Sequence, residues 1–192
     1  IVMRLVGSEM CIRDRSSDVV RLGSVTNTSA NSVNIDHYSS TYNYYLHLIR
    51  MEQETYSDRP RVRVRQGGST ITSSYYHYNW GGSQTNSGGN SNAQQGGTQN
   101  SAVGYFDTSI WNTRDTNFSK DLRIWVYHPT VSGTQRPYIM WDSWGTSSSS
   151  EAQHIQGFGY YDGTTSWTGL NLYTVGSNSA NWSVVTYGYK HT

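Results

Sequence analysis

Aromatic residues stand next to short polar residues at three places in the sequence, and this pairing suits the binding of sugars. Trp141 and Trp144 bracket Asp142, and other rings flank a glycine-rich stretch and an Asp162-Gly163 pair. A flat ring covers the C–H patch of a sugar, while short polar groups bond its hydroxyls. The competing interpretation is that each ring fills the core of a sandwich poor in Leu and Ile. The candidate ligand-binding residues are Tyr78, Trp80, Trp141, Asp142, Trp144, Tyr161, Asp162 and Trp167.

The sequence contains no motif typical of a catalytic or metal site. The single Cys11 excludes an intrachain disulfide and a cysteine-based zinc cluster, and the six histidines are scattered one at a time. No nucleophile elbow, zinc-protease motif, phosphate-binding glycine loop or calcium loop is present. We therefore predict no enzymatic activity, no catalytic residue, no metal and no cofactor. A glycosidase pair stays open among the acidic residues, which include Asp107, Asp115, Asp121, Asp142, Glu151 and Asp162.

The composition indicates one folded domain with a neutral polar surface. The chain has 192 residues, of which 14% are charged and 14% aromatic, and its formal net charge is +1. The rings supply apolar area that disordered chains lack, and this length suits one core better than two. So small a charge provides no field for nucleic acid or an anionic membrane, and no apolar stretch is long enough to span a bilayer. We expect neither a nucleic-acid partner nor membrane insertion.

Period-two alternation predicts β-strands along most of the chain. Val62 and Val64 alternate with arginines, which predicts one apolar and one solvated face. Both faces carry bulky side chains in residues 122–127, which predicts a central strand. The expected strands cover residues 33–38, 42–51, 62–64, 72–80, 122–127, 138–142, 154–161, 170–173 and 182–187. Roughly nine or ten strands without helical spacing predict an all-β fold, an antiparallel β-sandwich or jelly roll with minimal helix.

Two segments depart from this strand pattern. Residues 1–15 resemble translated read-through of a sequencing adapter, so we expect them to be non-native and the source to be a metagenome. Residues 16–192 are then a single β-sandwich domain. Residues 81–100 contain no apolar side chain larger than Ala, which predicts a long mobile loop, either a tolerated excursion or part of a recognition tip.

Glycines, alone or in a pair, mark the expected turns between strands. Turns are predicted at Gly67-Gly68, at Ser132-Gly133 and at Asp162-Gly163. The last of these predicts a hairpin.

Three segments resemble tail-fibre and virion-appendage proteins of marine bacteriophages. Residues 42–80 resemble that group's order of an aliphatic strand, a short Asp-containing loop, an alternating basic and apolar strand, a Gly-Ser turn and a Tyr-rich strand. Residues 121–145 resemble its strand-Pro-loop-strand unit, and residues 168–190 its closing pair of strands. The long insert at 81–100 and Asn178, where the pattern often has Gly, depart from the group.

The resemblance implies a jelly-roll module of an extracellular phage particle, in many cases trimeric and at a fibre tip. Its expected partners are a host cell-surface glycan or envelope, other virion proteins and further copies of itself as a homotrimer. The first functional hypothesis is therefore host attachment through glycan binding. A purely structural virion or capsid-decoration protein is the alternative, and a secreted bacterial carbohydrate-binding domain or glycosidase is a third.

Overall fold

The protein is an all-β antiparallel sandwich. The computed structural model describes residues 19–53, 60–73, 76–85, 91–98, 104–108, 119–130, 136–148, 151–163, 165–175 and 179–190, which hold thirteen strands and no helix. The larger sheet has, in spatial order, β1 (Val19–Ala30), β13 (Ala180–Tyr189), β3 (Tyr44–Gln53), β9 (Ser119–Tyr127), β10 (Tyr138–Ser148), β11 (Glu151–Tyr161), β6 (Tyr76–Thr85) and β7 (Ser91–Thr98). The smaller sheet has β2 (Ser32–Ile35), β12 (Gly169–Thr174), β4 (Pro60–Gln66) and β5 (Ser69–Thr70), with β8 (Phe106–Asp107) also paired to β4.

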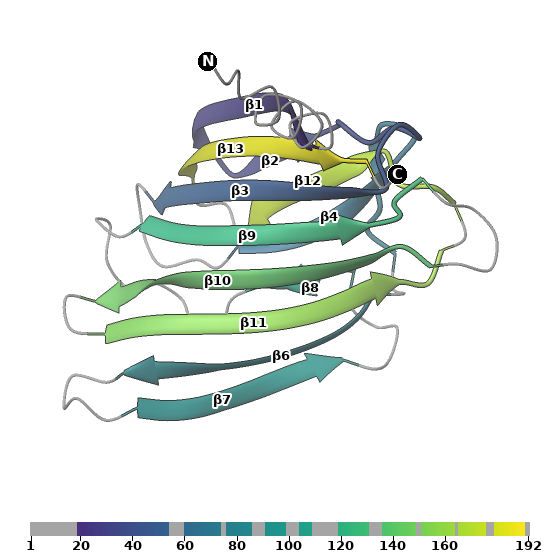
Figure 1. Cartoon of the computed structure of the whole chain (residues 1–192). Helices are drawn as coiled ribbons and strands as arrows, with labels where there is room; N and C mark the ends of the chain where they lie inside the picture. Colours follow the sequence, from purple (N-terminus) through teal and green to yellow (C-terminus); the bar gives the residue numbers. More distant parts are fainter. Residues whose placement is uncertain are drawn as a thin grey trace, which may run out of the picture.

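The connections run mostly between the two sheets, as in jelly-roll folds. Only β4–β5, β6–β7 and the β9–β10–β11 meander join strands of the same sheet in sequence. The smaller sheet lies behind one half of the larger sheet, while β6 and β7 extend past it (Figure 1). The larger sheet therefore has an inner face toward the smaller sheet and, on its other side, an outer face.

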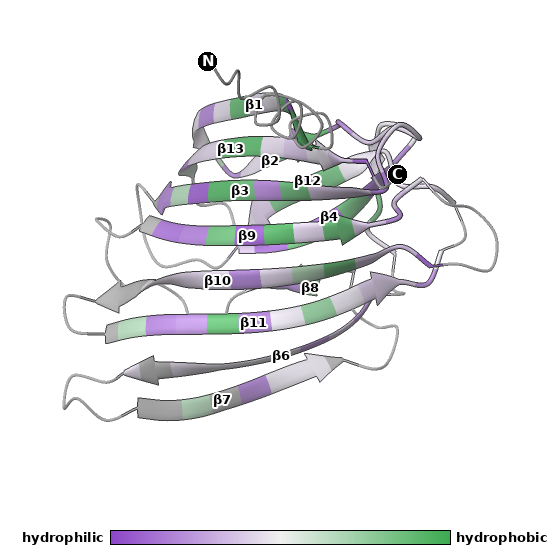
Figure 2. Cartoon of the chain, viewed as in Figure 1, coloured by the Kyte–Doolittle hydropathy of each residue, from purple (hydrophilic) through white to green (hydrophobic). Residues whose placement is uncertain are grey.

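The core lies between the inner face and the smaller sheet. Period-two alternation sends Leu122, Ile124 and Val126 of β9 inward, where they are at most 2% exposed. Val62 and Val64 face them from β4 with no exposed area. Hydrophobic and hydrophilic residues alternate along β3 and β9 in Figure 2. The predicted central position of β9 is confirmed, since it is fourth of eight strands.

The arginine side of β4 is not the solvated face that the sequence predicts. The Arg61 guanidinium lies 3.7 Å from the centre of the Tyr105 ring, and that of Arg63 lies 4.0 Å from the centre of Tyr173. Arg65 is 8% exposed and its Nε donates to an Asp36 carboxylate oxygen at 2.6 Å. Because rings and a carboxylate cover them, these arginines hold nearby segments onto the smaller sheet.

The prediction of a loop over residues 81–100 is wrong. β6 continues to Thr85 and pairs with β7, so the described part of this segment is a β-hairpin at the edge of the sheet. One of its glycines, Gly96, lies against a neighbouring ring. A Cβ placed on Gly96 would lie 2.4 Å from the Trp80 ring, so that ring occupies the space above the glycine. Burial against a ring on the next strand thus replaces the apolar side chains that β7 lacks.

The predicted turns have mixed outcomes. Gly67 and Gly68 have φ of 54° and 80° and join β4 to β5, so that predicted turn is confirmed as a hairpin. The Asp162-Gly163 pair does not form a hairpin, because the chain there leaves β11 for β12 in the other sheet. Ser132-Gly133 and the predicted artefact at 1–15 lie outside the described residues.

Candidate functional site

The outer face of the larger sheet carries most of the exposed apolar groups. All but one of the large hydrophobic side chains that are exposed in the described residues point outward from it; Val20 on the inner side of β1 is the exception. Because large exposed apolar side chains gather on this face, it is the candidate binding surface of the described residues. The outward-facing group consists of Val19, Leu48, Tyr138, Met140 and Phe158.

The most exposed of these side chains stands in a hollow lined by amides. Phe158 of β11 is 58% exposed, and Met140 beside it on β10 is 45% exposed. The amide side chains of Asn79, Gln95 and Gln156 line the same hollow, which has a volume of about 410 Å³. Besides these residues, backbone of Trp80, Gly81 and Gly157 contributes to the lining. We call this site the phenylalanine hollow, and none of its side chains is charged.

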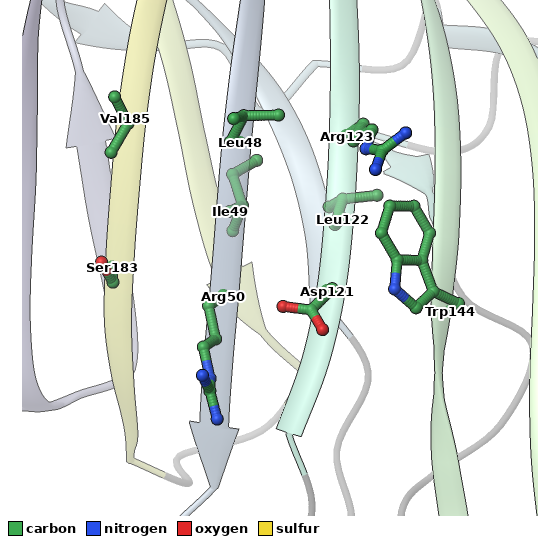
Figure 3. Close-up of a pocket in the computed structure, with 9 residues that line it drawn as sticks. All are labelled: Leu48, Ile49, Arg50, Asp121, Leu122, Arg123, Trp144, Ser183 and Val185. Carbon is green, nitrogen blue, oxygen red and sulfur yellow. The ribbon is translucent and has the colours of Figure 1, made fainter.

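A second hollow lies on the same face around Trp144, and we call it the tryptophan hollow. It measures 310 Å³. Figure 3 shows Trp144 and Arg123 on one side, Ser183 and Val185 on the other, and Leu48 between them. The Arg123 guanidinium lies 4.5 Å from the centre of the Trp144 ring. The other lining residues are Arg50 and Asp121, whose side chains are charged, together with Ile49 and Leu122.

Asp142 lies between the two hollows. It is the residue opposite Arg123 on β9 and opposite Gln156 on β11, so it adjoins one lining residue of each hollow. Its Oδ1 lies 2.5 Å from Nε2 of His154, which is itself the residue opposite Trp144. The histidine therefore holds one carboxylate oxygen of Asp142 in place between the two hollows.

Stacked rings form a row at one end of the outer face. Tyr44 stacks on Tyr189 at 4.9 Å and on Tyr127 at 5.9 Å, and Tyr127 stacks on Tyr138 at 4.6 Å. Burial, and then neighbouring tyrosines, raises the pKa of Tyr127 and Tyr189, so both keep their phenol protons. Tyr44 and Tyr127 each stack on two other rings, so their faces are covered by neighbouring tyrosines.

Three predicted site residues are corrected by their burial. Trp141, Tyr161 and Trp167 are 2%, 7% and 0% exposed and belong to the core, so they cannot contact a ligand. For these rings the core interpretation is the right one. Tyr78 and Trp80 are half-buried and also point to the inner face, because they pair in register with Gly159 and Gly157 on the inner side of β11.

The remaining predicted residues are accessible but do not all meet. Asp142 and Trp144 share the outer face, two positions apart on β10. Asp162 follows the far end of β11, and its carboxylate pairs with Arg136 at 2.8 Å. Eight residues of strand, or about 25 Å, separate it from His154 beside Trp144. Asp162 is therefore not part of either hollow.

The sequence reasoning missed Phe158, Met140 and the three amides of the phenylalanine hollow. A signal for them exists in residues 154–160, where His154, Gln156, Phe158 and Tyr160 occupy one phase of the alternation. Glycines occupy much of the other phase, which leaves the side-chain-bearing positions on the outer face. That signal is weak, because alternation alone does not say which face stays open to solvent.

The described part of the chain lacks two other features, a metal-ion site and a membrane-spanning helix. It contains no group of three His, Asp, Glu or Cys side chains placed to hold a metal ion. It also contains no helix long and apolar enough to cross a membrane. The sequence matches no protein-family model, and it matches no curated protein.

Proposed function

We propose that this chain is a non-catalytic module that binds a glycan on its outer face, and that it serves a phage virion appendage in attaching to the host surface. The observation that carries the glycan proposal is the phenylalanine hollow. An exposed Phe158 ring beside three uncharged amides matches a ligand with both C–H patches and hydroxyls. The virion setting is supported by the sequence resemblance alone.

The charge of the surface supports the same choice of ligand. A net charge of +1 over 192 residues gives no long-range attraction for a highly charged polymer. The side chains that surround Phe158 can donate and accept hydrogen bonds without a charge. Transfer of a neutral polyhydroxylated ligand from water to such a site costs little free energy, because amides there can replace the hydrogen bonds that its hydroxyls made with water.

Replacing the exposed ring tests the proposal directly. Phe158→Ala should lower glycan affinity about fivefold or more, because loss of one contacting aromatic ring typically costs about 1 kcal/mol or more. Stability should change by no more than about 0.5 kcal/mol, because the ring is exposed. The measurements are a glycan array and a pull-down with host envelope material, both with the full chain. Tyr187→Ala, which removes an outward ring of β13 that lines neither hollow, is the matched control.

A variant in the core serves as the control for loss of folding. Trp167→Ala empties a fully buried site and should destabilise the protein by about 3–5 kcal/mol. Two results would contradict the proposal. In one, Phe158→Ala binds glycan or host envelope as well as the wild type does; in the other, the folded wild-type chain binds neither. Turnover of a bound polysaccharide that disappears in Asp142→Asn would show instead that the outer face is catalytic.

The exposed apolar side chains favour one other function, a purely structural role in the virion. Leu48, Met140 and Phe158 could be covered by another virion protein as readily as by a ligand. In that case Trp144→Ala and Phe158→Ala should impair particle assembly. Normal assembly with lost adsorption to host cells supports attachment instead.

A further inference from the structure

The two hollows lie on one straight line across the sheet. Val185, Leu48 and Arg123, which line the tryptophan hollow, are opposite one another on β13, β3 and β9. The line continues through Asp142 on β10 to Gln156, Gly81 and Gln95 of the phenylalanine hollow. All these residues point outward, so one track perpendicular to the strands connects both hollows.

From this arrangement we propose that the outer face binds the interior of a linear polysaccharide, with the chain lying across the strands and occupying both hollows at once. This inference rests on the proposed glycan binding and names its ligand class. Neighbouring strands are about 4.8 Å apart, so hollows centred three strands from each other are roughly 15 Å apart. A single sugar ring occupies one hollow only, whereas an extended oligosaccharide reaches both.

The chemistry along the track is continuous. The phenylalanine hollow offers a ring and amides, the tryptophan hollow offers the Trp144 ring beside Arg123 and Asp121, and Asp142 supplies an acceptor between them. The track runs from β13 to β7, and beyond it the described sheet continues only at one end, to β1. Because both hollows are open on the surface of a sheet, the described residues include no wall that would select a chain terminus.

If one oligosaccharide occupies both hollows, its affinity should depend on its length. Once one hollow is occupied, the second binding event becomes intramolecular, and affinity rises by a factor of roughly 10² to 10⁴ without any new contact. A disaccharide gains nothing from this effect. A hexasaccharide should therefore bind on the order of a hundredfold more tightly than a disaccharide of the same polymer.

The test titrates the full chain with size-graded fragments, from disaccharide to hexasaccharide, of cellulose, laminarin, dextran, chitin and mannan, using isothermal titration calorimetry. The wild-type protein should bind two disaccharides but one hexasaccharide, and the hexasaccharide more tightly. Trp144→Ala and Phe158→Ala should each remove most of the gain with length while leaving disaccharide binding at the intact hollow. Tyr187→Ala, with its ring outside the track, should keep the gain.

The possible results separate this inference from the proposed function. Fragments that bind with equal affinity at every length, or a gain that survives Trp144→Ala, would overturn the two-hollow track while leaving glycan binding in place. No binding of any fragment would overturn both. Melting temperatures of the variants close to that of the wild type exclude unfolding as the cause of lost binding.

Discussion

His47 shows how a single side chain can be polar and still belong to the core. It lies on the inner side of β3 with no exposed area, where Nε2 is 2.7 Å from the Tyr38 hydroxyl and Nδ1 is 3.0 Å from the Thr186 hydroxyl. Burial, and to a smaller extent the nearby His37, lowers the pKa of His47 from 6.5 to about 3. The two hydroxyl partners satisfy the neutral ring, so the folded protein contains an uncharged histidine.

This lowered pKa predicts acid sensitivity of folding. Between pH 6.5 and pH 3 the unfolded chain protonates this histidine and the folded chain does not, so its contribution to stability is complete above pH 6.5 and is lost as pH falls. We expect the free energy of unfolding to drop by about 2 kcal/mol from this residue between pH 7 and pH 5, since each unit of pKa difference is worth about 1.4 kcal/mol.

Urea titrations at several pH values measure the effect. His47→Gln keeps a neutral side chain that can donate and accept hydrogen bonds, so this variant should be less stable at pH 7 but lose less stability on acidification. An equally steep pH dependence in wild type and variant would show that His47 is not the group responsible.

Pairs of one ring and one glycine shape the strands at the far side of the larger sheet. A Cβ on Gly157 would lie 2.2 Å from the Trp141 ring, and one on Gly159 would lie 2.8 Å from Phe106. Trp80 and Gly96 form the same arrangement between β6 and β7. The rings of Trp141 and Trp80 come from the strand next to their glycine, so there the larger sheet covers itself. The Phe106 ring comes from β8, which pairs with the smaller sheet.

Gly96→Ala tests this arrangement in the hairpin. The added methyl group must displace the Trp80 ring, and overpacking of this kind costs about 1–3 kcal/mol. Gln95→Ala, at the next position of β7 with its side chain on the opposite face, should have little effect on stability. In a Trp80→Val background the cost of Gly96→Ala should largely disappear, because the two changes are coupled. Equal costs in both backgrounds, measured by urea unfolding, would refute the contact.

At the scale of the whole molecule, the two halves of the larger sheet have unequal support. β9 lies between β3 and β10 and sends three side chains into the core. β7 is the last strand of its sheet and pairs with β6, and none of its residues whose burial the structure describes belongs to the buried core. Local stability follows the burial and pairing of each strand, so the hairpin should open more easily than the centre.

Native-state hydrogen exchange reports this difference. Amides of β9 should exchange only with global unfolding, and their opening free energy should fall with added urea. The opening free energies of β7 amides should be lower than those of β9 by several kcal/mol. They should also depend little on urea, as expected for local fluctuations. Matching opening free energies for β7 and β9 would show that the sheet unfolds as one unit and that the hairpin is not a separate element.

The sequence was sufficient for the class of fold and for most strands. Alternation in residues 62–64, 122–127 and 182–187 placed strands where the structure has β4, β9 and β13, because a period of two follows from the pleat of the backbone itself. It failed at residues 81–100. There Gly96 packs against the Trp80 ring of the neighbouring strand, a contact that local composition does not reveal.

The candidate site depended far more on tertiary structure. Trp141 and Trp144 are three residues apart in the sequence, yet one is buried and the other borders a hollow, because an odd spacing along a strand places them on opposite faces. Phe158 meets Asn79 and Gln95 only because β11, β6 and β7 are neighbours in the sheet. Local chain geometry therefore determined that there are two faces, and the packing of the sheets decided which of them remains open to a ligand.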